Sequence, residues 1–177
     1  MKMLVQILAV CLMLILSPNV FQVVGQDKNK SVKKNVDERL ELKGYFADGR
    51  RYRLVLIESQ YKSKIRDDGS FWGRDGGIPN RIVSLISLQI NEEEVWLPRK
   101  SYADLCELSH SSVTVRLINN KILIRVEGGD AGGSFTAKFF IQKYKQAYRL
   151  SERIINHGEN PNEIWERTIY HNDFWNR

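Results

Sequence analysis

From Leu40 onward, apolar and polar side chains alternate along the chain with a period of two, and this pattern constrains the fold more than any other feature. Apolar residues occupy every second position in the segments 51–57, 112–117, 121–126 and 135–141. Because alternate side chains of a strand point to opposite faces, each segment predicts a strand with one buried and one wetter face. Such half-polar strands are typical of antiparallel sheets.

Turn residues separate the alternating segments. Asn119–Asn120 is a two-residue connection, and asparagine tolerates the left-handed backbone conformation that a tight hairpin requires. Asn91–Glu94 is expected to return the strand 82–90 into a strand over 95–97. Further turns are expected at Ala47–Arg50 and Gly128–Gly133.

Two segments are read differently from the rest. The sequence Ser101–Asp104 resembles a capping box and predicts one short helix beginning there. The segment 144–156 fits either a helical stripe or a strand centred on 149–155, and we favour the strand because alternation resumes over 164–170. The predicted fold is mainly β: a single antiparallel β-sandwich or open barrel of about eight strands with one short helix, after an N-terminal signal peptide.

The N-terminus has the layout of a secretory signal peptide. Met1 and Lys2 precede an apolar run from Leu4 to Leu16, which is shorter than the roughly 20 residues that span a bilayer. We expect cleavage after Gly25 and a secreted or periplasmic product; the alternative is an uncleaved anchor, in which case the leader is the only membrane contact. The expected organisation is a signal peptide over 1–25, a flexible basic tether over 26–38 and a single β-rich domain over 39–177.

Cysteine and charge narrow the classes of function. Cys11 lies in the leader, so Cys106 remains alone, and its apolar neighbours predict a buried, inert thiol. The whole chain carries a net charge of +6. This charge is too diffuse to indicate a nucleic-acid partner, and it suits an anionic glycan or surface, or an unknown protein.

The most distinctive motif is the glycine-rich run from Glu127 to Phe135, which contains Asp130 and Ser134. Glycine permits backbone angles that other residues resist. The run is either a hairpin connection whose Asp130 caps its own backbone, or a ligand loop with exposed amides and one carboxylate.

A second candidate lies around Trp72, which is flanked by acidic turns that include Asp75. Trp72 either packs as an anchor or offers a flat face to a sugar ring. The spacing of the aspartates does not match a calcium loop. We therefore assign a candidate binding site to four residues: Trp72, Asp75, Asp130 and Ser134.

The sequence supplies no coherent catalytic set. His110, His157 and His171 have no neighbour at metal-ligand spacing, so no metal or cofactor is predicted. We expect an exported, non-enzymatic binding or structural module of the cell envelope or extracellular space. The alternative is an extracytoplasmic hydrolase or ion-dependent enzyme that uses the glycine-lined carboxylate of Asp130.

Overall fold

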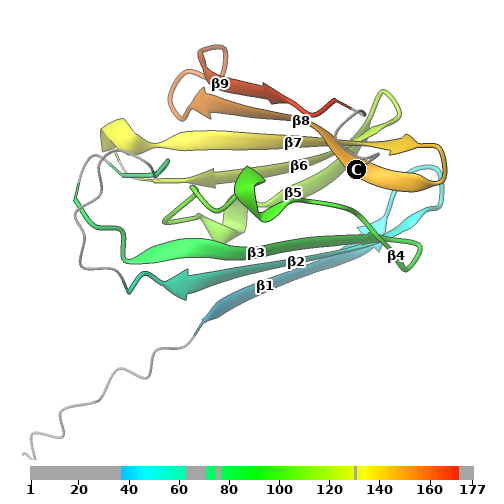
Figure 1. The fold of residues 1–177 in the computed structure, drawn as a ribbon, viewed down its shortest axis with the longest axis horizontal. Helices are drawn as coiled ribbons and strands as arrows, with labels where there is room; N and C mark the ends of the chain where they lie inside the picture. The colour runs from blue at the N-terminus through cyan, green and yellow to red at the C-terminus, as the bar shows by residue number, and fades with distance from the viewer. Residues whose placement is uncertain (1–36, 63–70, 75–76, 130, 172–177) are drawn as a thin grey trace, which may run out of the picture. The chain divides into compact units, whose positions relative to one another are not determined.

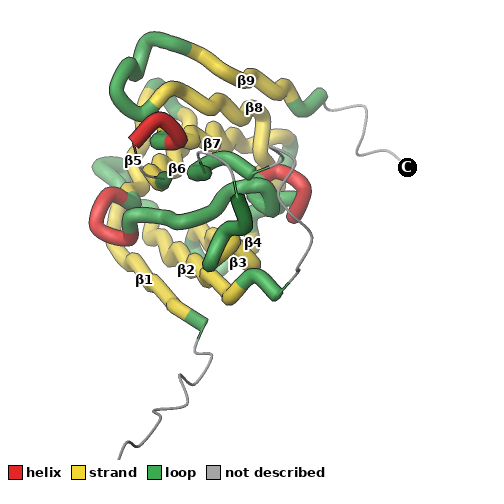
Figure 2. Tube along the Cα trace, turned by 90° about the vertical axis from the view of Figure 1, so that its left-hand side faces the viewer, coloured by secondary structure: helices red, strands yellow, loops and turns green. Residues whose placement is uncertain are grey.

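The computed structural model describes residues 37–62, 71–74, 77–129 and 131–171, and these residues form two antiparallel sheets. The first sheet has the order β1-β2-β3-β4, with strands β1 (Glu38–Tyr45), β2 (Arg51–Gln60), β3 (Arg81–Ile90) and β4 (Glu93–Glu94). The second has the order β5-β6-β7-β8-β9, with strands β5 (Thr114–Ile118), β6 (Lys121–Gly128), β7 (Phe135–Tyr144), β8 (Ala147–His157) and β9 (Ile164–Ile169). Three short 3-10 turns interrupt the loops (Figure 2): η1 (Arg99–Ser101), η2 (His110–Ser112) and η3 (Ala131–Gly133). The prediction of a mainly β fold with antiparallel strands is confirmed.

The alternation in the sequence decides which side chains enter the core. The buried cluster combines residues from both sheets: Leu54, Leu56 and Leu88 from the first, and Ile124, Phe139 and Ile155 from the second. The two sheets therefore share one hydrophobic core, and Figure 1 shows them as two layers, β1–β3 on one side and β5–β9 on the other. The arrangement is consistent with a β-sandwich.

The tight hairpins follow from residues that accept a positive φ. Asn119 and Asn120 have φ values of 48° and 64°, which confirms the predicted hairpin between β5 and β6. Asn91 and Glu92 repeat this geometry between β3 and β4, with φ values of 48° and 73°. The Asn91 side-chain oxygen also accepts a hydrogen bond of 2.8 Å from the backbone N–H of Arg51.

The structure corrects two predictions in the linker between β4 and β5. No α-helix begins at Ser101: the η1 turn ends there, and the Ser101 hydroxyl donates to the carbonyl of Pro98. The expected strand over 95–97 is also wrong, because the first sheet ends at Glu94 and the backbone of Trp96 bonds to β8 of the second sheet. In both places, backbone hydrogen bonds to distant segments outweigh local propensity.

The other expectations have mixed outcomes. The ambiguous segment 144–156 is strand, as favoured, because β8 pairs with both β7 and β9. Cys106 is fully buried, as predicted. The leader 1–25 and almost all of the tether lie outside the described residues. Within the described ranges, no helix combines the length and apolar character needed to cross a bilayer.

Candidate functional site

Trp72 lies at one end of the sheets and packs against a second tryptophan. Its ring stacks on that of Trp165 at a centroid distance of 5.5 Å and an interplanar angle of 20°. Its backbone bridges Leu105, and the next residue, Gly73, has φ +108° and leaves no room for a Cβ atom beside the carbonyl of Cys106. Trp72 is therefore an anchored aromatic whose ring lines a small recess of about 220 Å³.

The glycine-rich loop after β6 lies against the Trp72 segment. A Cβ atom on Gly129 would approach the Cα atom of Gly73 to 2.7 Å, and Gly132 and Gly133 line the same recess as Trp72. Ser134 lines a different recess, beside Gly158, and its buried Oγ has no hydrogen-bond partner among the described residues. The structure thus brings the two predicted loops together but places Trp72 and Ser134 in separate hollows. Asp75 and Asp130 lie outside the described residues.

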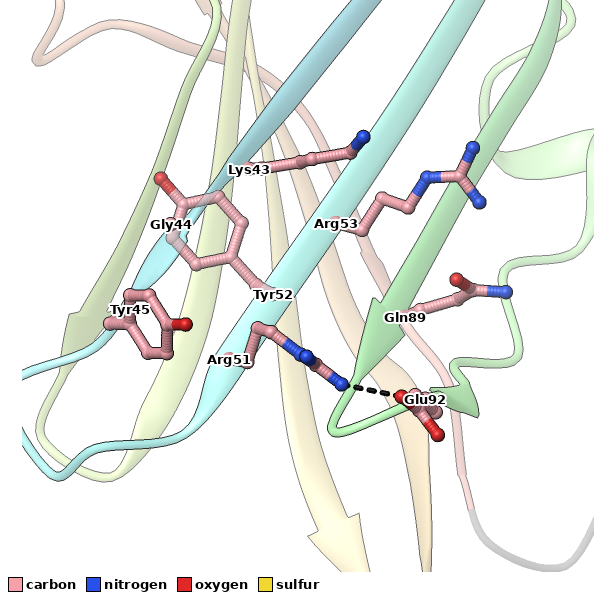
Figure 3. A pocket seen from close by; sticks show the side chains of 8 residues that line it. All are labelled: Lys43, Gly44, Tyr45, Arg51, Tyr52, Arg53, Gln89 and Glu92. Atoms are coloured by element: carbon pink, nitrogen blue, oxygen red, sulfur yellow. Dashed lines mark hydrogen bonds and ion pairs between the residues drawn. The ribbon is translucent and has the colours of Figure 1, made fainter.

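A large recess lies on the outer face of the first sheet, and Figure 3 shows Lys43 and Arg53 side by side on that face. We call it the outer-face recess; it measures about 530 Å³ and includes Tyr45, which is 74% exposed. Each cation already has an acidic neighbour: Arg51 pairs with Glu92 at 2.5 Å, and Arg53 and Lys43 both pair with Glu41.

The hydrogen bonds from Arg53 and Lys43 lower the pKa of Glu41 to about 2, so this carboxylate stays ionised at neutral pH. Much of the positive charge on this face is consequently offset, and solvent screens the remainder.

A second large recess opens at the side of the molecule, where the linker after β4 crosses to the second sheet. We call it the edge recess; it measures about 460 Å³, within the range of roughly 300–1,000 Å³ typical of ligand sites. Its lining includes apolar and aromatic groups beside a few polar ones, among them Trp96, Pro98, Lys100, Arg153, Thr168 and Tyr170.

Backbone hydrogen bonds hold the walls of the edge recess in place. The Trp96 N–H donates to the carbonyl of Tyr148, and the Trp96 carbonyl accepts from the N–H of Leu150, each at 3.2 Å. The opposite wall is the end of β9, where the Tyr170 N–H donates to the carbonyl of Ser151 at 2.9 Å. Because its backbone is fixed in this way, Trp96 presents a side chain that is 41% exposed from a rigid position.

Arg153 supplies the charged part of the edge recess and is only 4% exposed. It lies on the inner face of β8, two positions before the fully buried Ile155. Its guanidinium pairs with Asp104 at 2.6 Å and with Glu166 at 3.3 Å, which supplies the compensation that a buried cation requires. The bonding of this cluster is nevertheless incomplete, because Arg153 Nε and Asp104 Oδ1 are buried without a hydrogen-bond partner among the described residues.

Burial also shifts the ionisation of the groups around Arg153. It raises the pKa of the Asp104 carboxyl, and the attraction of Arg153 only partly opposes this rise. Burial likewise raises the pKa of the Tyr170 hydroxyl, which bonds to Ser101. Perturbed ionisable groups beside an open recess are a frequent mark of a functional site.

Sequence reasoning missed the edge recess. One local signal was present: Arg153 shares the strand face of Ile155, so a charge falls where alternation predicts a buried residue. The partners of Arg153 come from the linker and from β9, and no local pattern connects them to it. Comparisons with protein-family models, with curated proteins and with solved structures return no match.

Proposed function

We propose that the protein is an exported, non-enzymatic binding module, a single β-sandwich domain that acts in the periplasm or outside the cell. We further propose that its ligand is a glycan and that one sugar ring binds in the edge recess. The observation that carries this proposal is the combination, in the lining of one recess, of an exposed tryptophan and a buried arginine.

Each part of the recess suits a feature of a sugar. The apolar face of a pyranose ring stacks on an indole, and Trp96 offers a partly exposed indole held by its backbone. Sugar hydroxyls both donate and accept hydrogen bonds. Arg153 lines the recess, and its guanidinium carries N–H donors of the kind that sugar hydroxyls accept from.

Charge favours an acidic glycan over a neutral one. Lys100 lines the edge recess, and Arg153 adds its own charge, although Asp104 and Glu166 offset the latter. The chain as a whole is also basic, with a net charge of +6. These features support attraction to an anionic polymer, whereas the edge recess supports recognition of one of its units.

The hydrolase alternative depends on Asp130 and Asp75, which lie outside the described residues, and it stays an untested prediction. The lining of the edge recess offers aromatic and charged groups that can hold a ligand in place. Asp104 and Glu166 both bind the same guanidinium, so the two carboxylates are committed to balancing Arg153. Binding is therefore the activity that the described geometry supports best.

A panel of purified glycans tests the proposal. Wild-type protein is titrated calorimetrically with alginate, polygalacturonate, hyaluronan, heparin and peptidoglycan fragments, with dextran as the neutral comparison. We expect at least one acidic glycan to bind, Trp96→Ala to weaken its binding at least about tenfold, and Trp96→Phe to weaken it less, because a smaller aromatic face remains.

Tyr45→Ala is the matched control, because it removes an exposed aromatic from the outer-face recess and leaves the edge recess intact. Circular dichroism confirms that each variant is folded. Binding that survives Trp96→Ala but is lost in Tyr45→Ala would move the site to the outer face. Absence of binding to every member of the panel would overturn the glycan proposal.

A further inference from the structure

A second buried ionic cluster lies away from the edge recess and brings together residues far apart in the sequence. Glu58 in β2 is 1% exposed, and its carboxylate bonds to the Nε2 atom of His110 at 2.8 Å. Its other oxygen accepts the N–H of Leu108 at 3.0 Å. Glu38 faces Glu58 across the β1–β2 pairing, so a third potential ligand joins the group.

The strand register and the linker create this convergence. The pairing of β2 with β3 shifts by one residue between Ile57 and Glu58, as at a β-bulge. Such irregularities redirect side chains, and the carboxylate of Glu58 lies within reach of the linker. There Leu108 bridges Gly128, and His110 begins the η2 turn that leads toward β5.

We propose that Glu38, Glu58 and His110 form a binding site for a divalent transition-metal ion of the Zn²⁺ type. One donor atom from each residue lies within 4.8 Å of the other two. Ligand distances to zinc are about 2.0–2.2 Å for both imidazole nitrogen and carboxylate oxygen, so ligand atoms around one ion stand roughly 3–3.5 Å apart. The exposed side chain of Glu38 has the freedom to close the remaining gap.

The chemistry of the donors selects the class of metal. A neutral imidazole coordinates through a ring nitrogen, and Nε2 of His110 already points at Glu58. A mixed nitrogen and carboxylate set suits zinc and its neighbours, whereas magnesium and calcium prefer oxygen ligands alone. Two carboxylates balance the charge of a divalent ion, and they include a buried one that otherwise relies on His110 and a backbone N–H.

Arg81 is the main competitor of the metal. It pairs with Glu38 at 3.0 Å and also donates to the backbone carbonyl of Glu58 at 3.2 Å. A carboxylate that meets a guanidinium through one oxygen still offers its other oxygen, so Arg81 can stay as an outer partner of a bound ion. Its positive charge nonetheless weakens binding, and removal of that charge should increase the affinity for zinc.

The position of the site indicates a structural role for the ion. Glu38 and Glu58 belong to the first sheet, and His110 precedes the edge strand β5 of the second. An ion held by all three would join β1, the edge strand of its sheet, to the linker and so resist fraying of β1.

Titration of the purified protein with ZnCl₂ at pH 7.5 tests the inference. We expect one ion per chain by calorimetry, a rise in thermal midpoint with zinc and no rise with the same concentration of MgCl₂. Co²⁺ replaces Zn²⁺ in a parallel titration, because direct coordination produces a visible d–d absorption band.

Matched variants separate coordination from a plain ion pair. His110→Ala should lower the affinity for zinc at least about tenfold and abolish the cobalt band, and the more exposed Glu38→Gln should weaken both readouts without unfolding the protein. Arg81→Gln should raise the affinity. His171→Ala, at an exposed histidine remote in sequence, should leave the zinc affinity and the cobalt band unchanged.

Two outcomes overturn the site: no binding of zinc by either wild type or Arg81→Gln, or binding that survives His110→Ala at wild-type strength. The result is independent of the glycan titration, because the two experiments use different residues and different ligands.

Discussion

The two buried charge clusters differ in the groups that surround the buried charge. Arg153 lies beside the open edge recess, its partners are two carboxylates, and polar atoms of the cluster have no bond among the described residues. Glu58 is equally buried, but a backbone N–H and a histidine occupy its oxygens. The first cluster therefore places a paired arginine in the lining of a recess, whereas the second brings two carboxylates and a histidine ring together.

This difference shows why burial alone does not identify a ligand. A buried arginine keeps its charge at every physiological pH, so it continues to need acidic partners. A buried glutamate beside a histidine can become neutral by taking up a proton, or it can bind a cation. The two clusters should consequently respond differently to substitution. Three measurements test this expectation, and a fourth compares the clusters with an exposed ion pair.

The largest effect is expected from Arg153→Ala. The variant leaves Asp104 and Glu166 without their shared cation in a mostly buried site, which should reduce the free energy of unfolding by about 3–5 kcal/mol. Urea denaturation followed by circular dichroism measures the loss. A cost below about 1 kcal/mol would show that solvent reaches this cluster and that the contrast between the clusters is not real.

Glu58→Gln should cost less, about 1 kcal/mol, measured in the same way. The amide of glutamine can still accept the N–H of Leu108 through its oxygen and can still form a hydrogen bond with the ring of His110. A loss as large as that of Arg153→Ala would instead mean that Glu58 and His110 form an obligatory ion pair.

A smaller, pH-dependent effect is expected from Asp104. Burial raises its pKa above the usual 3.8, so the folded protein holds this proton more tightly than the unfolded chain does. The contribution of Asp104 to stability should therefore fall as pH rises from about 3.8 through the raised pKa. The free energy of unfolding of wild type and of Asp104→Asn is measured by urea denaturation at several pH values from 3 to 7. We expect the difference, wild type minus variant, to decrease over this range. A difference that increases with pH would show that the ion pair with Arg153 outweighs burial.

The smallest effect is expected from Glu41→Gln on the outer face. Glu41 pairs with Arg53 at 2.7 Å and with Lys43 at 3.0 Å, distances as short as those in the buried clusters. Solvent screens these exposed pairs, so the midpoint of urea denaturation at pH 7 should stay within experimental error. A clear shift would mean that distance, rather than burial, governs the ionic contributions in this protein.

The strands were predictable because alternation is a local property. The residues at 121–126 and 135–141 face the core in the expected phase, and the Asn119–Asn120 hairpin follows from the backbone freedom of asparagine. The predicted helix at Ser101 failed because the backbone after it bonds to remote segments: Leu105 bridges Trp72, and Cys106 bridges Ile82.

The candidate site was less predictable than the fold. Reasoning from composition led to glycine and tryptophan motifs, and the structure places the loops of Trp72 and Gly129 in contact. Sequence reasoning could not reveal the edge recess, because its walls come from the linker near Trp96 and from β8 and β9. The only local sign was a charge at Arg153 on the apolar face of its strand.

The sequence by itself determined the β class, the inward and outward faces of most strands, the tightest hairpin and the burial of Cys106. These properties depend on side-chain period and turn chemistry, which act over a few residues. The tertiary structure alone decided which charges are buried together: Arg153 with Asp104 and Glu166, and Glu58 with His110 and Glu38. These contacts between charged side chains depend on strand register and on the path of a long linker. Both are set by the packing of the whole core rather than by residues adjacent in the sequence.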